Sequence, residues 1–281
     1  MLLRLVPGFR RAMDLSLVLD AEGIVHELRS VAEEKWALVV SDDDAARAEA
    51  ALTAFERENP PAQRKRSTLL PLADGIVAGL VFGLSLLALH IWTGPESAGS
   101  TWFARGSAEA EKIVGGEWWR AITALTLHAD AAHAAGNAAL GGLLLAILAR
   151  MFGAGVASWL VLLAGAAGTF LAAGLLQHSF VSVGASTAVF GALGALAAAQ
   201  ATDPGQRRRA WVPLGAGLAL LGFLGTGKRA DFAGHLCGFL AGVALGLLAA
   251  RLPRWRNRAG QAALALAAAA VPVCAWWRAH S

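Results

Sequence analysis

Charged side chains are scarce in this chain of 281 residues. Asp, Glu, Lys and Arg make up 16% of it and hydrophobic residues 56%, whereas a soluble domain averages roughly 25% charged residues. The polar residues are clustered, which leaves apolar tracts near the length of about 20 residues that a bilayer-spanning helix needs. The composition argues against a soluble enzyme and against a disordered or collagen-like chain, and it predicts several membrane spans.

Cysteine is also rare. Cys237 and Cys274 both lie inside apolar tracts, which indicates neither a disulfide framework nor a zinc knuckle. The net charge of +4 would permit nucleic-acid binding, but the basic residues stand beside hydrophobic tracts and so favour a membrane surface. We therefore expect the lipid bilayer as a partner, with no nucleic acid, no metal and no cofactor.

Residues 1–66 are the one stretch that has the composition of a soluble domain. An apolar run, two alternating runs typical of strands and a charged amphipathic helix occupy 15–19, 24–30, 36–40 and 42–58 in turn. The helix is predicted to stop at Asn59, before two prolines, with Ala46, Ala50, Leu52 and Phe55 on one side. We interpret residues 1–66 as a small cytoplasmic α+β domain.

Seven apolar tracts follow, and we interpret them as transmembrane helices of an all-α polytopic membrane protein. They lie near 69–93, 124–149, 155–176, 185–201, 211–226, 231–250 and 260–277. The fourth and fifth tracts are short for a full crossing, which is tolerated where neighbouring helices shield a span.

The distribution of Lys and Arg between the loops predicts the orientation, because cytoplasmic loops carry an excess of both. With a cytoplasmic N-terminus, the inner segments hold Arg64, Lys65, Arg66, Arg150, Arg207, Arg208, Arg209, Arg251, Arg254, Arg256 and Arg258. The outer segments then hold Arg105, Lys112, Arg120, Lys228, Arg229 and Arg278. We expect a multi-pass protein of the cell (inner) membrane, with the N-terminus cytoplasmic and the C-terminus outside.

Polar side chains at membrane depth are costly and usually face a cavity or a partner. Three tracts open with such residues: His128, His133 and Asn137 in the second, 184–187 in the fourth, and Asp231 with His235 in the sixth. In the predicted topology all three groups lie at a similar shallow depth below the outer surface. This placement predicts a shared, water-filled pocket.

The residue types in this pocket suit acyl-transfer chemistry. His133 and Asn137 are four residues apart, so they share one helical face, and both can donate hydrogen bonds to an oxyanion. Ser186 is expected at a helix start, near free backbone N–H groups. Small residues that allow close helix contact follow Ser186 and His235, namely Gly191, Gly194, Gly238, Gly242 and Gly246. Close contact would pair the Ser186 hydroxyl with the His235 imidazole as nucleophile and base. Asp231 is expected to mark the start of the helix that carries His235.

Together these segments resemble the rhomboid intramembrane serine proteases. The motifs are Trp119-Arg120, the group His128, His133 and Asn137, the run GASTAVFG at 184–191, and His235 followed by Gly238 and Gly242. They occur in the family's order and spacing over about 69–250. The resemblance implies a six-helix core, here 67–252, and an additional C-terminal transmembrane helix within 253–281.

The resemblance also implies residue roles. Ser186 would be the nucleophile and His235 the general base, with His133 and Asn137 as oxyanion donors. His128, Gly184 and Phe190 would support them. The implied activity is that of a serine endopeptidase without a cofactor, which cleaves single-span transmembrane proteins near the outer membrane face.

Other readings of the same residues remain open. Thr187 follows Ser186 where family members usually have glycine, which keeps open a catalytically inactive rhomboid-like protein that binds membrane helices. A transporter with a histidine proton relay is a second alternative. A metal site of His128, His133 and His235 lacks a carboxylate ligand and the spacing of known motifs. The remaining histidines, His26, His90, His178 and His280, show no partner pattern and are interpreted as incidental.

Overall fold

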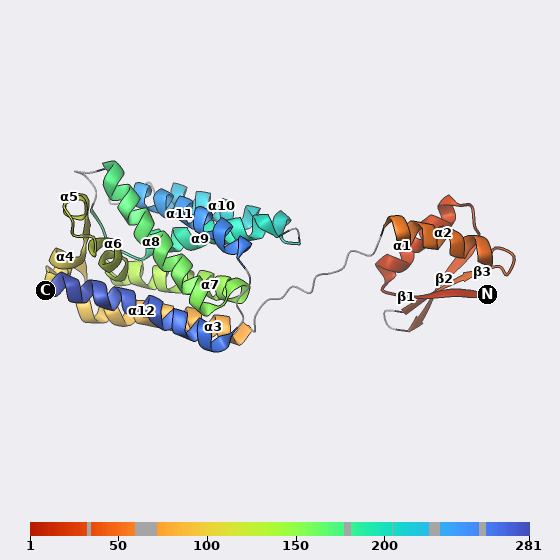
Figure 1. Cartoon of the computed structure of the whole chain (residues 1–281), viewed down its shortest axis with the longest axis horizontal. Coiled ribbons are helices and arrows are strands. Elements are labelled where there is room, and N and C mark those ends of the chain that lie inside the picture. The colour runs from red at the N-terminus through yellow and green to blue at the C-terminus, as the bar shows by residue number, and fades with distance from the viewer. Residues whose placement is uncertain (33–34, 60–71, 177–180, 204, 225–230, 253–256) are drawn as a thin grey trace. The chain divides into compact units, whose positions relative to one another are not determined.

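The computed structural model describes residues 1–32, 35–59, 72–176, 181–203, 205–224, 231–252 and 257–281 (Figure 1). The chain divides into two compact units, Met1–Ser67 and Thr68–Ser281, and each is described by itself. Several predictions fall outside the described residues: the boundary at 66/67, the boundary at 252/253, His178, and the basic residues at 64–66, 228–229, 254 and 256.

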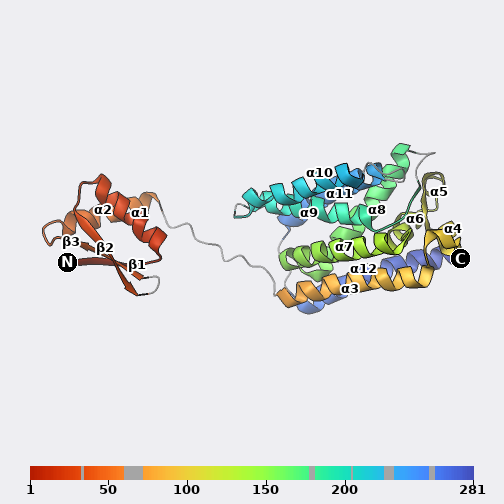
Figure 2. The same ribbon diagram turned by 180° about the vertical axis from the view of Figure 1, so that it is seen from behind.

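The N-terminal unit is an antiparallel three-stranded sheet with two helices on one face (Figure 2). In chain order its elements are β1 (Leu2–Pro7), α1 (Phe9–Ala21), β2 (His26–Ala32), β3 (Lys35–Val40) and α2 (Ala45–Glu58). The strand order is β1-β3-β2, so the last strand lies in the middle. Leu15, Leu19, Leu38 and Leu52 are almost fully buried between the sheet and the helices.

One detail of the predicted α2 is wrong. Ala46 and Ala50 are exposed, and the buried side of the helix carries Ala48 and Leu52. The reason is the helical period: positions three and four apart share a face, and Ala48 falls in line with Leu52, whereas Ala46 and Ala50 do not. The sequence prediction also assigned no strand to residues 2–7.

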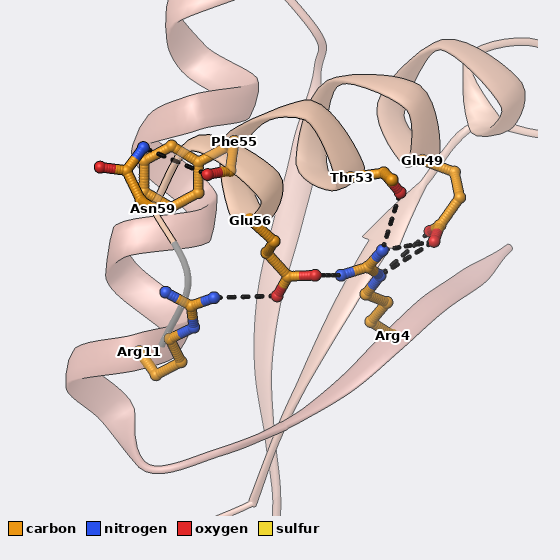
Figure 3. Close-up of polar contacts among 7 residues, drawn as sticks. All are labelled: Arg4, Arg11, Glu49, Thr53, Phe55, Glu56 and Asn59. Carbon is orange, nitrogen blue, oxygen red and sulfur yellow. Dashed lines mark hydrogen bonds and ion pairs between the residues drawn. The ribbon is translucent and has the colours of Figure 1, made fainter. Parts of the chain in front are cut away.

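Glu56 on α2 links α2 to the first strand and the first helix (Figure 3). One carboxylate oxygen accepts from Arg4 at 2.8 Å and the other from Arg11 at 2.8 Å. Arg4 also donates to Glu49 and to Thr53. The hydrogen bond from Arg4, followed by that from Arg11, lowers the pKa of Glu56 below its ordinary value of 4.5.

We expect the N-terminal unit to lose stability in acid through Glu56. A lowered pKa means that folding favours the ionised carboxylate, so this contribution is present above about pH 4.5 and is lost as the pH falls through the folded-state pKa. Amide exchange of α2 in the intact chain, corrected for the intrinsic pH dependence of exchange, should accelerate over that range. Glu56→Gln should flatten the profile, and an unchanged profile in that variant would contradict the assignment to Glu56.

The second unit is a bundle of apolar helices. They are α3 (Leu72–Thr93), α7 (Ala131–Phe152), α8 (Ala154–Leu176), α9 (Ser186–Thr202), α10 (Trp211–Leu224), α11 (Phe232–Arg251) and α12 (Arg258–His280). In the described part of the chain, five of them, α3, α7, α8, α11 and α12, are long and apolar enough to cross a membrane. The chain is therefore a multi-pass membrane protein, and full crossings by α9 and α10 remain predictions.

Helix α9 is the centre of this unit. It contacts α7, α8, α10 and α11, and thirteen of its seventeen residues are buried. A helix surrounded by other helices needs no long lipid-facing surface of its own, so the length of 17 residues fits the central position of α9.

A folded segment joins α3 to α7. It consists of η1 (Glu96–Ala98), α4 (Thr101–Gly106), β4 (Ala108–Glu109), α5 (Ala110–Val114), α6 (Arg120–Thr123) and η2 (Ala124–Thr126). Strand β4 pairs with β5 (Val181–Ser182), just before α9. The buried guanidinium of Arg120 holds the segment together, because it donates to the backbone oxygens of Ala104 and Ser107 and to the carboxylates of Glu109 and Glu117.

Candidate active site

Ser186 and His235 lie in direct contact at the starts of α9 and α11. Nε2 of His235 is 2.8 Å from Oγ of Ser186. His235 is buried, with 6% of its surface exposed, whereas Ser186 is half-buried. A hydroxyl and an imidazole at this distance can exchange a proton.

Glycines bring the two helices this close together. A Cβ atom on Gly242 would lie 1.9 Å from the carbonyl oxygen of Gly191, and one on Gly194 would lie 2.1 Å from that of Phe239. Distances this short leave no space for any side chain. The predicted close contact along these glycine faces is therefore confirmed.

The ring of Phe190 packs on the His235 ring, and Asp231 caps the helix that carries His235. Phe190, one turn after Ser186 on α9, stacks on the imidazole with centroids 4.5 Å apart and 20° between the ring planes. Asp231 caps the start of α11, where its Oδ1 accepts from the backbone N–H of Gly234 at 2.7 Å. As the sequence predicted, Asp231 marks the helix start.

His133 and Asn137 on α7 lie against the backbone just before Ser186. A Cβ on Gly184 would lie 2.5 Å from Cε1 of His133 and 3.4 Å from Nδ2 of Asn137. Gly184 also has φ 118°, in the region that favours glycine. Among the described residues, the buried Nδ2 of Asn137 has no acceptor. A free donor at this place can bind an oxygen atom of a ligand.

His128 occupies a different position from the one that the sequence predicted. It precedes α7, which begins at Ala131 after the cap Asp130, so it lies outside the second transmembrane helix, in which the sequence analysis placed it. The His128 side chain is fully buried, and its Nε2 accepts from the backbone N–H of Ala185 at 3.3 Å. His128 therefore holds the backbone next to Ser186.

Three further contacts that support the site were not predicted from the sequence. The carbonyl oxygen of Ala124 accepts from the N–H of Gly184 at 2.9 Å. Asp130 accepts from the N–H of His133 at 2.8 Å and so fixes the first turn of α7. His90 on α3, interpreted as incidental from the sequence, packs edge-on against His128 with centroids 6.5 Å apart.

Thr187 points away from Ser186 into a helix interface. Thr187 is 1% exposed. A Cβ atom added to Gly168 of α8 would lie 2.9 Å from Cγ2 of Thr187, and a Cβ atom added to Gly238 of α11 would lie at the same distance. Two glycines therefore provide the space for its methyl group. The side chain that departs from the family pattern packs between α8 and α11.

Within the described residues, no three His, Cys, Asp or Glu side chains are grouped so as to hold a metal ion. His128 and His133 do pack together, with centroids 5.2 Å apart. Since His128 Nε2 accepts from Ala185, that nitrogen is already engaged.

The structure is thus that of a multi-pass membrane protein in which a buried central helix, α9, contacts α11 through the Ser186–His235 pair. Residues 115–252 match the family model of the rhomboid domain, so this part of the chain belongs to the rhomboid family. It is similar to the Rhomboid protease GluP of Bacillus subtilis (strain 168), with 33% identity over 156 residues. The matched part covers 52% of this chain and 30% of that protein.

Proposed function

We propose that this protein is an intramembrane serine protease that uses Ser186 as nucleophile and His235 as general base. The observation that carries the proposal is the 2.8 Å contact between the Ser186 hydroxyl and His235 Nε2. The rhomboid domain match and the similarity to a protein named as a rhomboid protease support the same reaction class.

The proposed reaction begins with proton transfer. His235 Nε2 takes the proton of Ser186 Oγ as this oxygen bonds to the carbonyl carbon of the scissile peptide. The tetrahedral intermediate then loses its amine, which receives the proton from His235, and an ester to Ser186 remains. Water, deprotonated by the same imidazole, hydrolyses the ester to a carboxylate and restores the Ser186 hydroxyl.

Charge develops at two places during this reaction. The oxyanion would form near Nδ2 of Asn137, which is buried and free, and near His133, which lies against Gly184. Donors fixed in advance at such a place stabilise the transition state more than the ground state. The imidazolium would form under the ring of Phe190, whose π face attracts a cation.

The substrates we propose are single-span transmembrane proteins, cleaved near the outer membrane face. A helical peptide bond is hydrogen-bonded and shielded by side chains, so the substrate segment has to unwind before Ser186 can attack it. We further propose that the protein lies in the cell (inner) membrane with its N-terminus in the cytoplasm and its C-terminus outside, on the Lys and Arg distribution.

The packing of Thr187 favours the protease over an inactive helix-binding protein. The alternative gained its support from a bulky residue beside Ser186, but that side chain fills a space between Gly168 and Gly238. The Ser186–His235 contact is intact in its presence.

We expect an alkyl fluorophosphonate probe to label the purified protein at Ser186, because only an activated hydroxyl reacts with it. Labelling should disappear in Ser186→Ala. It should persist in the matched control Ser182→Ala, since Ser182 lies only four residues before Ser186 but belongs to β5, which pairs with β4. Absence of labelling in the wild type, with the fold intact, would favour the binding protein, and labelling that survives Ser186→Ala would refute the assigned nucleophile.

A further inference from the structure

The last helix, α12, packs on the bundle along a narrow stripe. Its buried residues are Gln261, Ala268 and Ala275, seven residues apart, which places one contact on the same face every two turns. Its main neighbours are α8, α6 and α4. Such a helix adds little buried surface, so its polar contacts near each end stand out.

The first contact is the buried amide of Gln261. Its Nε2 donates to the carbonyl oxygen of Phe152 at 3.1 Å, where α7 ends. Its Oε1 accepts from Gly155 at 2.8 Å and from Val156 at 3.1 Å, in the first turn of α8. A single side chain thus satisfies backbone groups that helix ends leave open.

The second contact is the indole of Trp276, near the other end of α12. Its Nε1–H donates to Oγ1 of Thr126 at 3.0 Å. Its ring lies on Gly106, where a Cβ would be only 2.2 Å from Cη2. Trp102 packs edge-on against the indole, with centroids 4.9 Å apart.

Thr126 lies in the middle of the segment that holds the backbone before Ser186. Two residues before it, the carbonyl oxygen of Ala124 accepts from Gly184. Two residues after it, His128 Nε2 accepts from Ala185. Thr126 is itself buried and donates to the carbonyl oxygen of Thr123 at 2.7 Å. The Trp276 indole therefore bonds directly to the segment that presents the Gly184–Ala185 backbone.

We infer that α12 is a positioning element for the active site and that Trp276 is its positioning residue. By its hydrogen bond to Thr126, Trp276 holds residues 124–128 in the position where Ala124 and His128 bind the backbone of Gly184 and Ala185. This keeps Ser186 facing His235. The expected effect on the reactivity of Ser186 rests on the proposed function. The expected effect on the order of the Gly184–Ala185 backbone does not depend on it.

The direct test is hydrogen exchange of peptides that cover residues 181–188 in the intact, detergent-solubilised protein. In Trp276→Phe, which keeps a ring on Gly106 but removes the N–H, exchange should accelerate about fivefold, the factor that one neutral buried hydrogen bond is worth. Thr126→Val should act likewise, and Thr126→Ser, which keeps the hydroxyl, should restore slow exchange. The matched control is Trp277→Phe, because Trp277 is 74% exposed.

A second readout is the rate of fluorophosphonate labelling at Ser186, which should fall by a similar factor in Trp276→Phe and Thr126→Val. In the double variant, Trp276→Phe should add nothing to the effect of Thr126→Val, since Thr126→Val already removes the bond to Trp276 together with the bond to Thr123. Unchanged exchange at 181–188 in both single variants would overturn the inference. If the wild type is not labelled at all, the proposed protease function fails, while the exchange result still decides the positioning role.

Discussion

Ser186→Ala and His235→Ala should each reduce the cleavage of a model single-span substrate by at least about a thousandfold. In the structure these two side chains form one unit, joined by the contact of 2.8 Å between Nε2 and Oγ. When one member is lost, the other has no proton-transfer partner. The double variant should therefore be no slower than either single variant.

The measurement is the turnover of purified protein reconstituted in bilayers, with Thr187→Val as the matched control. This change keeps the shape of the side chain beside Ser186 and its packing against Gly168 and Gly238. It should retain most of the wild-type turnover, because the methyl group that fills the space between Gly168 and Gly238 is kept. Effects that multiply in the double variant would show that the two residues act independently, against the proposed mechanism.

Asn137→Ala should lower kcat by about a hundred- to a thousandfold, with little change in KM. Its amide nitrogen is buried beside Gly184 and is free to donate, so the bond it makes is expected to form mainly in the transition state. An interaction made only there lowers kcat when it is removed and leaves ground-state binding unchanged.

The control for this prediction is Thr169→Val, another buried polar residue, whose hydroxyl bonds to the carbonyl oxygen of Gly165 within α8. Loss of this local bond should leave kcat nearly unchanged. A rise in KM with unchanged kcat in Asn137→Ala would instead assign Asn137 to substrate binding.

The group of residues that meet at the site could be predicted because polar side chains are conspicuous at membrane depth. Ser186, His235, His133 and Asn137 stand out against tracts of Leu, Ala and Gly, and the cost of burying each one implies a partner. Their joint occurrence at one predicted depth therefore located the contact between α9 and α11. Their catalytic roles remain predictions that the variants above test.

The supporting contacts could not be predicted in the same way. Ala124 and Gly184 meet through backbone atoms, which carry no side-chain signal. A single histidine on an apolar helix, such as His90, shows no pattern until the helix that faces it is known. The 2–7 strand was also missed, and its place at a sheet edge depends on β3, which follows much later in the chain.

The Gln261 amide has a consequence for the order in which the protein assembles. The turn between α7 and α8 is made early in synthesis, whereas the side chain that completes its hydrogen bonds is added more than a hundred residues later. Until α12 has entered the bilayer, the backbone groups of Phe152, Gly155 and Val156 depend on water at the membrane surface. We therefore expect the hydrogen bonds of this turn to be completed only after α12 has inserted.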